Sequence, residues 1–66
     1  MRTKLKIFRI TRKFNQHQMA ASIGYERAYY GHVERGYQGG SAAFWKRLQQ
    51  AFGLTDNEVQ ELKEVE

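Results

Sequence analysis

The 66-residue chain contains no cysteine and no proline. Without cysteine it has neither a disulfide framework nor a thiolate zinc site, so packing of apolar side chains has to stabilise the fold. Without proline, runs of helix-permissive residues are separated by Gly, Asn, Ser and Thr, a pattern that favours several short helices over strands. Hydrophobic residues make up 41% of the chain and aromatic residues 14%, which is enough for one core. We therefore expect residues 1–66 to form a single all-α domain.

Long apolar runs are also missing. No stretch approaches the roughly 20 apolar residues that a membrane-spanning helix needs. The basic N-terminal segment is not followed by an uninterrupted apolar stretch, so it does not match a secretory signal. Together with the lack of cysteine, these absences predict a cytoplasmic protein that does not associate with membranes.

The positive charge is concentrated in the first half of the chain. Residues 1–35 hold eight Lys and Arg against two Asp and Glu, whereas residues 36–66 hold three against five, within a total net charge of +4. A basic half joined to an acidic half indicates one surface that faces a polyanion and another that faces solvent.

Local signals divide the chain into five predicted helices. Glycines that follow helical runs are expected to end them in the left-handed conformation, namely Gly24, Gly36 and Gly53. Three runs are preceded by residues that cap helix N termini, namely Asn15, Ser41 and Thr55. Thr55 and Asn15 each have a Glu or Gln three residues later, which is the spacing of a capping box. The predicted helices span residues 3–13, 16–23, 27–35, 41–52 and 56–65.

Apolar residues recur at i, i+3 and i+4 along these helices, the spacing of a buried helix face. We expect the core to consist of Leu5, Phe8, Met19, Ala20, Ile23, Tyr30, Val33, Phe44, Leu48, Ala51, Phe52, Leu54, Val59 and Leu62. Phe14, immediately before the Asn15 cap, is placed to staple the entry into the second helix. Trp45 lies beside the main apolar stripe of the fourth helix, so it is either a core residue or a dimer contact.

Residues 14–36 have the organisation of a helix-turn-helix. Two short predicted helices are joined at residues 23–26, where Gly24 permits a tight turn. Ala20, four residues earlier, is small enough for the two helices to cross closely, and Tyr25 is placed to pack under the turn. In such a motif the second helix is held against the first, so that its exposed face can enter the major groove of DNA.

This segment resembles the helix-turn-helix of the phage repressor, Cro and XRE-type regulator family. The positions that carry the resemblance are Arg9, Phe14, Asn15, Gln16, Met19-Ala20, Ile23-Gly24 and Val33-Glu34-Arg35-Gly36. The resemblance implies a compact five-helix lambda-repressor-like domain with the helix-turn-helix at its second and third helices. It also implies a transcription regulator, acting as a repressor, that binds a pseudo-palindromic operator in double-stranded DNA as a homodimer.

The resemblance also assigns roles to individual residues. The exposed, groove-facing positions of the third helix, which would contact bases, are Arg27, Ala28, Gly31 and His32. Arg27 is the strongest candidate because its guanidinium can bind O6 and N7 of one guanine together. The residues expected to contact phosphates are Asn15, Gln16, Tyr29, Arg35 and Gln38, with the amides of Gly39 and Gly40 beside them.

Two structural expectations complete this interpretation. Arg9 and Glu34 correspond to the family's ion pair, which ties the first helix to the end of the third. Self-association is expected to use the fourth and fifth helices, and the candidate contacts are Phe44, Trp45, Leu54 and Val65.

Catalysis and metal binding find little support in the sequence. His17 and His32 have neither cysteine nor a converging set of carboxylates to accompany them, so we expect no metal and no cofactor. The acidic residues gather on the fifth helix as a solvated face, and Ser22 and Ser41 lie in capping or surface contexts. The chain is therefore not predicted to be an enzyme.

One alternative belongs to a different class of function. A protein-interaction module, such as an antitoxin, could be built on the same fold. Tyr29, Tyr37 and Trp45, if exposed, would suit a protein partner. Salt distinguishes the two possibilities, because binding to phosphates weakens steeply between about 50 and 200 mM salt.

Overall fold

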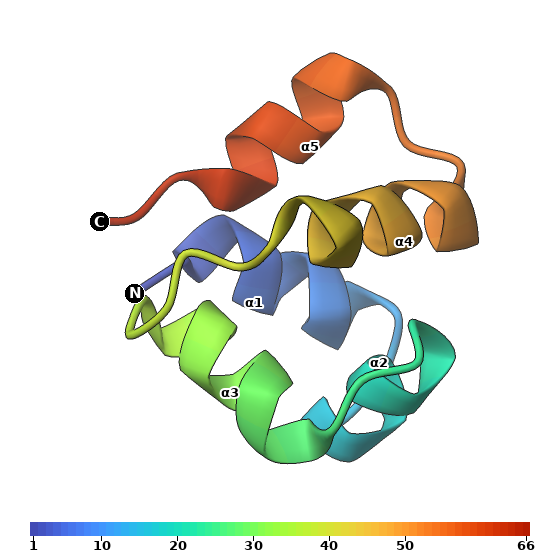
Figure 1. Cartoon of the computed structure of the whole chain (residues 1–66), viewed down its shortest axis with the longest axis vertical. Helices are drawn as coiled ribbons and strands as arrows, with labels where there is room; N and C mark the ends of the chain where they lie inside the picture. The colour runs from blue at the N-terminus through green and yellow to red at the C-terminus, as the bar shows by residue number, and fades with distance from the viewer.

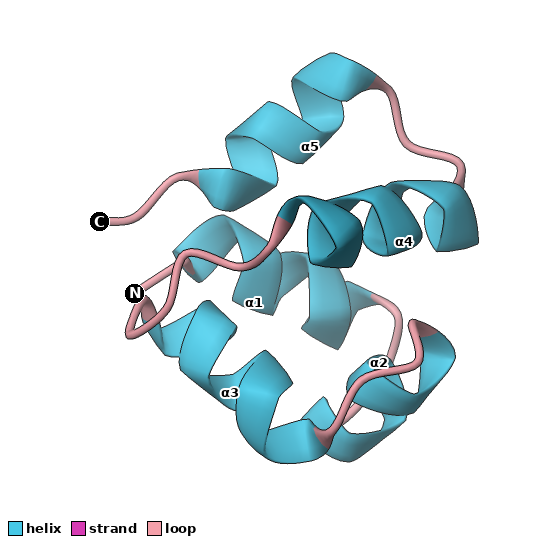
Figure 2. Ribbon diagram, viewed as in Figure 1, coloured by secondary structure: helices cyan, strands magenta, loops and turns pink.

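Five α-helices and their connections make up the computed structural model, which describes residues 1–66 and contains no β-strand (Figure 1, Figure 2). The helices are α1 (Thr3–Thr11), α2 (Gln16–Ser22), α3 (Arg27–Arg35), α4 (Ala42–Phe52) and α5 (Asp56–Lys63). The prediction of an all-α, five-helix fold is confirmed. α3 has the predicted bounds, and each of the other helices is one or two residues shorter than predicted.

Side-chain caps start three of the helices at the predicted positions. The Asn15 carboxamide oxygen accepts from the Gln18 amide at 2.8 Å, and the Gln18 side chain accepts from the Asn15 amide at 2.9 Å. Thr55 and Glu58 form the same reciprocal pair, with distances of 3.2 and 2.9 Å. At the start of α4, the Ser41 hydroxyl accepts from the Phe44 amide at 3.1 Å. Each cap satisfies an N–H that the first turn of a helix leaves without a partner.

α2 and α3 pack together at one end of the molecule, and α4 and α5 lie at the other (Figure 1). α1 runs between the two pairs and contacts both α3 and α5. The chain ends meet, because the Met1 ammonium donates to the Glu66 carbonyl at 3.2 Å and the Glu66 amide donates to the Met1 carbonyl at 2.9 Å. None of the five helices has the length and apolar character that a membrane span requires.

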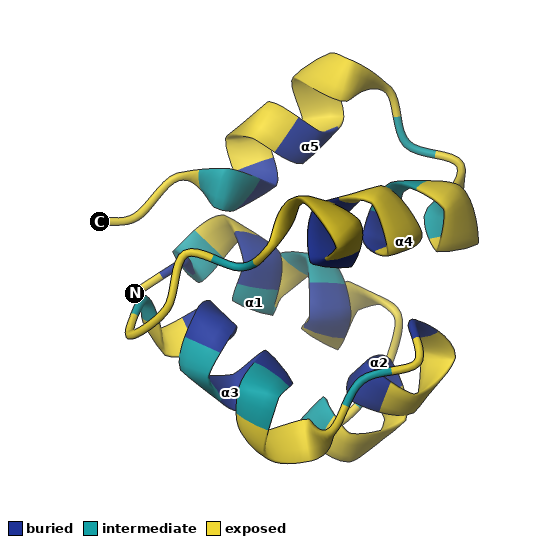
Figure 3. Cartoon of the chain, in the orientation of Figure 1, coloured by how far each residue is buried: buried dark blue, intermediate teal, exposed yellow.

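All five helices contribute side chains to one core, and each helix carries buried positions (Figure 3). The buried hydrophobic residues are Leu5, Met19, Ala20, Ile23, Tyr30, Val33, Phe44, Trp45, Leu48, Val59 and Leu62. The predicted core residues Phe8, Phe52 and Leu54 are partly buried against this cluster, as are Phe14, Tyr25 and Tyr29.

For α4, the structure supports one of the two alternatives for Trp45 and contradicts the expectation for Ala51. Trp45 is 4% exposed and belongs to the core, whereas Ala51, predicted to be buried, is exposed. With Trp45 in the buried stripe, the centre of that stripe rotates toward it and leaves Ala51 at the edge. Phe44 and Trp45 are therefore not available as dimer contacts. Of the other two dimer candidates, Leu54 is partly buried and Val65 is 55% exposed.

Candidate nucleic-acid interface

The turn between α2 and α3 is fixed by backbone hydrogen bonds and by one glycine. The Tyr25 amide donates back to the Ala20 carbonyl at 2.9 Å, which folds the chain tightly after α2. Gly24 has a φ of +76°, and a Cβ there would lie 2.8 Å from Nη1 of Arg47. The positive φ favours glycine at this position, whereas the Arg47 guanidinium is the end of a flexible, exposed side chain that can move aside. The chain then becomes extended at Glu26, and α3 starts at Arg27.

Aromatic packing determines which face of α3 points outward. Tyr30 and Val33 are fully buried in the core. Tyr29 stacks on Tyr25 with ring centroids 5.3 Å apart, and both rings pack edge-on against Phe44. The opposite face of α3, including its first turn, is consequently left toward solvent (Figure 3).

That outward face and the start of α2 together line a shallow depression of about 170 Å³. Its lining residues are Gln16, Arg27, Ala28, Gly31, His32 and Arg35. The depression therefore brings together all four residues predicted to contact bases and two of those predicted to contact phosphates.

Gly31 does not occupy an exposed position, so that expectation is wrong. It is buried, and a Cβ there would lie 3.4 Å from Nη1 of Arg35 and 3.4 Å from Oε1 of Gln16. The side chains of Gln16 and Arg35 thus cover the backbone at Gly31.

The arginine side chains that line the depression form no ion pair with a carboxylate. Arg27 and Arg35 are both exposed. The protein has two ion pairs, Lys4–Glu64 and Arg9–Glu34, and neither involves Arg27 or Arg35. Ala28 is also exposed and His32 is half-buried. Two unpaired guanidinium groups on one helix face form a site suited to phosphate or guanine.

Three predicted phosphate-contact residues lie outside the depression. Asn15 is exposed, but its side-chain oxygen is used in capping α2. Tyr29 is half-buried, and its hydroxyl oxygen accepts from the Ser41 amide at 3.1 Å. Gln38 is exposed in the connection from α3 to α4.

Beneath the depression lies a buried ion pair that connects three helices. Arg9 of α1 donates to the two carboxylate oxygens of Glu34 in α3 at 2.9 and 3.1 Å, and it also donates to the Phe14 carbonyl at 2.8 Å. The Gln16 side chain donates to the same Glu34 carboxylate at 3.3 Å. Gln16 is therefore oriented from below by Glu34 while it lines the depression above.

The surroundings of Glu34 change its protonation. Burial by itself raises the pKa of Glu34, but the hydrogen bonds from Arg9 and Gln16 and the adjacent Tyr30 hydroxyl lower this pKa by more, so that it falls below the usual glutamate value. The Tyr30 hydroxyl lies beside Glu34 but has no hydrogen-bond partner of ordinary geometry. Burial raises the pKa of Tyr30 well above its ordinary value. Glu34 is accordingly ionised and Tyr30 neutral near neutral pH.

Arg2 is a buried cation that was not among the predicted site residues. It is 5% exposed and has no carboxylate partner. Its guanidinium donates to the carbonyls of Val33 at 2.6 Å, Gln38 at 2.8 Å, Gly39 at 3.3 Å and Lys63 at 3.0 Å. Every residue has a backbone carbonyl, so a binding site made of carbonyls cannot be predicted from residue types in the sequence.

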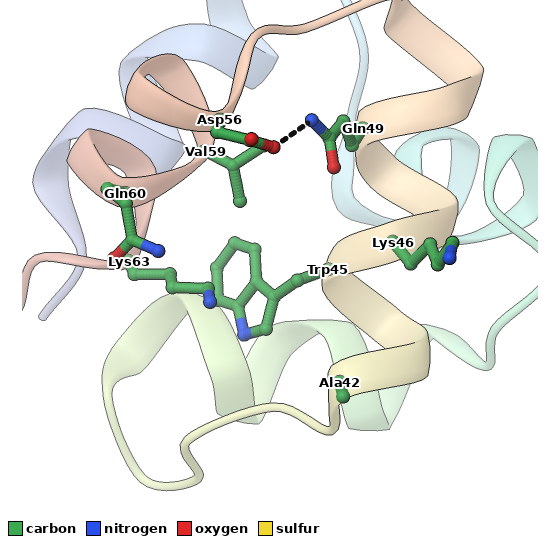
Figure 4. A pocket seen from close by; sticks show the side chains of 8 residues that line it. All are labelled: Ala42, Trp45, Lys46, Gln49, Asp56, Val59, Gln60 and Lys63. Atoms are coloured by element: carbon green, nitrogen blue, oxygen red, sulfur yellow. Dashed lines mark hydrogen bonds between the residues drawn. The ribbon is translucent and has the colours of Figure 1, made fainter.

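A second and larger hollow, of about 380 Å³, lies between α4 and α5 (Figure 4). Trp45 reaches across it, and the Lys63 ammonium lies 5.8 Å from the indole centroid. The lining residues are Ala42, Trp45, Lys46, Gln49, Asp56, Val59, Gln60 and Lys63. No residue predicted to contact DNA lines this hollow.

The sequence model of one family, described as a helix-turn-helix domain, matches residues 1–62. The match covers all of the first four helices and nearly all of α5. Neither a curated protein sequence nor a solved structure gives a significant match to the chain.

Proposed function

The chain belongs to the helix-turn-helix domain family, and on this basis we propose that it binds double-stranded DNA sequence-specifically with α3 in the major groove. The observation that carries the proposal is the depression formed by α2 and α3. It gathers two carboxylate-free arginines, a histidine and a glutamine on one outward face. Domains of this family are typically binding domains rather than enzymes, which agrees with a function based on contacts alone.

Base reading in this proposal falls to the outer face of α3. Arg27, in the exposed first turn, donates bidentately to O6 and N7 of a guanine. Ala28 contacts a thymine methyl group, and His32 donates to a guanine or a phosphate. Gly31 has no base contact in this scheme, because the side chains of Gln16 and Arg35 cover it.

Phosphate contacts orient α3 in the groove. Gln16, at the start of α2, binds one phosphate, with Asn15 beside it. Arg35 and Gln38, at the other end of α3, bind a second stretch of backbone, and Tyr29 donates its hydroxyl proton while its oxygen accepts from the α4 N terminus.

The resemblance to phage repressors and Cro extends the proposal. As a single cytoplasmic domain, the protein would dimerise on a pseudo-palindromic operator and repress transcription by obstructing RNA polymerase. Val65 and Leu54 are the remaining candidates for the dimer contact. The alternative, a protein-interaction module, relied on three exposed aromatic residues. Two of them are not free at the surface, because Trp45 is buried and Tyr29 is packed against Tyr25.

An NMR titration of ¹⁵N-labelled protein with duplex DNA tests this proposal. Amide shifts should change along α3 and at the start of α2, while the amides of α5 stay unchanged. The changes should fade as salt rises from about 50 to 200 mM, because counterion release drives the binding. Shift changes centred on α5, or no change with folded protein, would contradict the proposal. That outcome would favour a protein partner.

A further inference from the structure

The connection between α3 and α4, residues 36–41, is held from inside by two side chains. Arg2 donates to the carbonyls of Gln38 at 2.8 Å and Gly39 at 3.3 Å. The Trp45 indole N–H donates to the same Gly39 carbonyl at 3.0 Å. The Arg2 guanidinium also lies 5.5 Å from the indole centroid, so the two side chains support each other.

The inward carbonyls determine where the next amides point. The chain has no cis peptide bond, and the C=O and N–H of a trans peptide point in opposite directions. Because the carbonyls of Gln38 and Gly39 face Arg2 and Trp45, the N–H groups of Gly39 and Gly40 face away from the protein interior. Neither of these N–H groups donates to any acceptor in the protein.

The outward amides belong to the connection that follows the last turn of α3. The amides of Tyr37 and Gln38 both donate to the His32 carbonyl, at 2.9 and 3.3 Å, which folds the connection back onto the last turn of α3. His32 and Arg35 of that turn line the depression. The free N–H groups of Gly39 and Gly40 therefore lie in a segment that is anchored to the turn of α3 that lines the depression.

We propose that Arg2 and Trp45 are positioning residues for DNA binding, which hold residues 38–40 so that the Gly39 and Gly40 amides face the DNA and bind a backbone phosphate. This inference rests on the proposed function. Neither side chain touches the DNA. Each side chain holds a carbonyl of the connection, and the N–H group of the same peptide bond contacts the DNA phosphate.

The chemistry of the Arg2 site explains why arginine occupies it. Two of its acceptors, the carbonyls of Val33 and Lys63, lie at the C-terminal ends of α3 and α5, where the helix dipole is negative, and the Val33 carbonyl also accepts from the Gly36 amide at 3.1 Å. These helix ends compensate the buried charge without a carboxylate. A guanidinium can donate to four separated carbonyls, whereas a lysine ammonium has three donors on a single atom.

The test compares two variants that disturb the connection independently. Arg2→Lys keeps the charge but cannot reach all four carbonyls. Trp45→Phe keeps an aromatic core residue but removes the donor to Gly39. The matched control is Lys4→Gln, which removes a charge from the same helix region at an exposed ion pair with Glu64. Thermal melts first define a temperature at which every variant is fully folded.

At that temperature, duplex affinity, its salt dependence and the ¹⁵N–¹H shifts of Gly39 and Gly40 are measured. Both variants should bind specific and unrelated duplexes about tenfold more weakly, as expected for a lost hydrogen bond to a charged group. Because both keep the charge of the wild type, the slope of log affinity against log salt should not change. The shifts of Gly39 and Gly40 should move in the variants and stay in place in Lys4→Gln.

The possible failures are distinguishable. If the wild type binds no duplex, the proposed function fails and this inference fails with it. If the wild type binds and both variants bind equally well, the inference alone is overturned. Trp45→Phe decides the question by itself if Arg2→Lys does not fold.

Discussion

Replacing Arg9 with Ala removes the cation that partners Glu34. Glu34 is 1% exposed and would retain only the Gln16 hydrogen bond at 3.3 Å among its side-chain hydrogen bonds. Removing one partner of a buried pair costs about 3–5 kcal/mol, because the other charge is left uncompensated. The total stability expected for a domain of this size is of order 3–10 kcal/mol. Since each kcal/mol shifts the melting temperature by about 4–8 °C, Arg9→Ala should lower it by at least about 12 °C.

The pH dependence of this loss distinguishes an electrostatic cause from a packing cause. The folded-state pKa of Glu34 is lowered, so in the wild type its stabilising contribution is present above the unfolded pKa of about 4.3 and is lost as pH falls through the folded value. In Arg9→Ala, burial acts without the cation and raises the Glu34 pKa. The difference in unfolding free energy between wild type and variant should therefore shrink as pH falls from about 7 to about 4.

Circular-dichroism melts and urea titrations at both pH values measure this difference. The matched control is Lys4→Ala, which breaks the other ion pair, between side chains that are 47% and 56% exposed. Solvent screens that pair, so the control should melt close to the wild type at both pH values. The reasoning is refuted if Arg9→Ala melts like Lys4→Ala, or if its destabilisation is independent of pH.

The remaining predictions concern the DNA-binding face and one glycine. Arg27→Ala should relax base preference at one position of the operator and cost about 1–3 kcal/mol there, and unchanged preference in competition binding would remove Arg27 from base reading. Gln16→Ala should weaken binding to all duplexes alike, whereas a loss confined to one sequence would mean that Gln16 reads a base. Gly40→Ala should destabilise the fold more than Gly53→Ala. Both positions have positive φ, but a Cβ at Gly40 would lie 2.6 Å from Nε1 of Trp45 and one at Gly53 would meet nothing within 4 Å. Equal melting temperatures for these two variants would contradict the close contact with the indole.

Helix positions were largely predictable because their signals are local. Asn15, Ser41 and Thr55 cap the helices that they precede, and Gly24, Gly36 and Gly53 have φ values of +76°, +83° and +63° after the helices that they follow. Each signal depends on residues within one or two turns. The first helix ends two residues earlier than predicted, and Lys13 after it adopts a φ of +60°. A lysine gives no signal of this left-handed conformation.

Features that depend on distant contacts were not predictable. The side on which Trp45 packs is decided by its contacts with the α3–α4 connection and α5. Gly31 is buried, and the side chains of Gln16 and Arg35 lie close to it. Arg2 donates to carbonyls that are 31 to 61 residues away along the chain. Such contacts form only in the assembled fold, so they cannot be predicted from the spacing of apolar residues within a single helix.

The central claim is that α3 reads DNA sequence, and selection from a random duplex library at near-physiological salt tests it most directly. Folded wild-type protein should enrich one sequence, a pseudo-palindrome with half-sites about 10 bp apart. Arg27→Ala, selected in parallel, should enrich the same sequence with one position relaxed in each half-site. If the folded wild-type protein enriches no sequence, the claim that α3 reads DNA is contradicted.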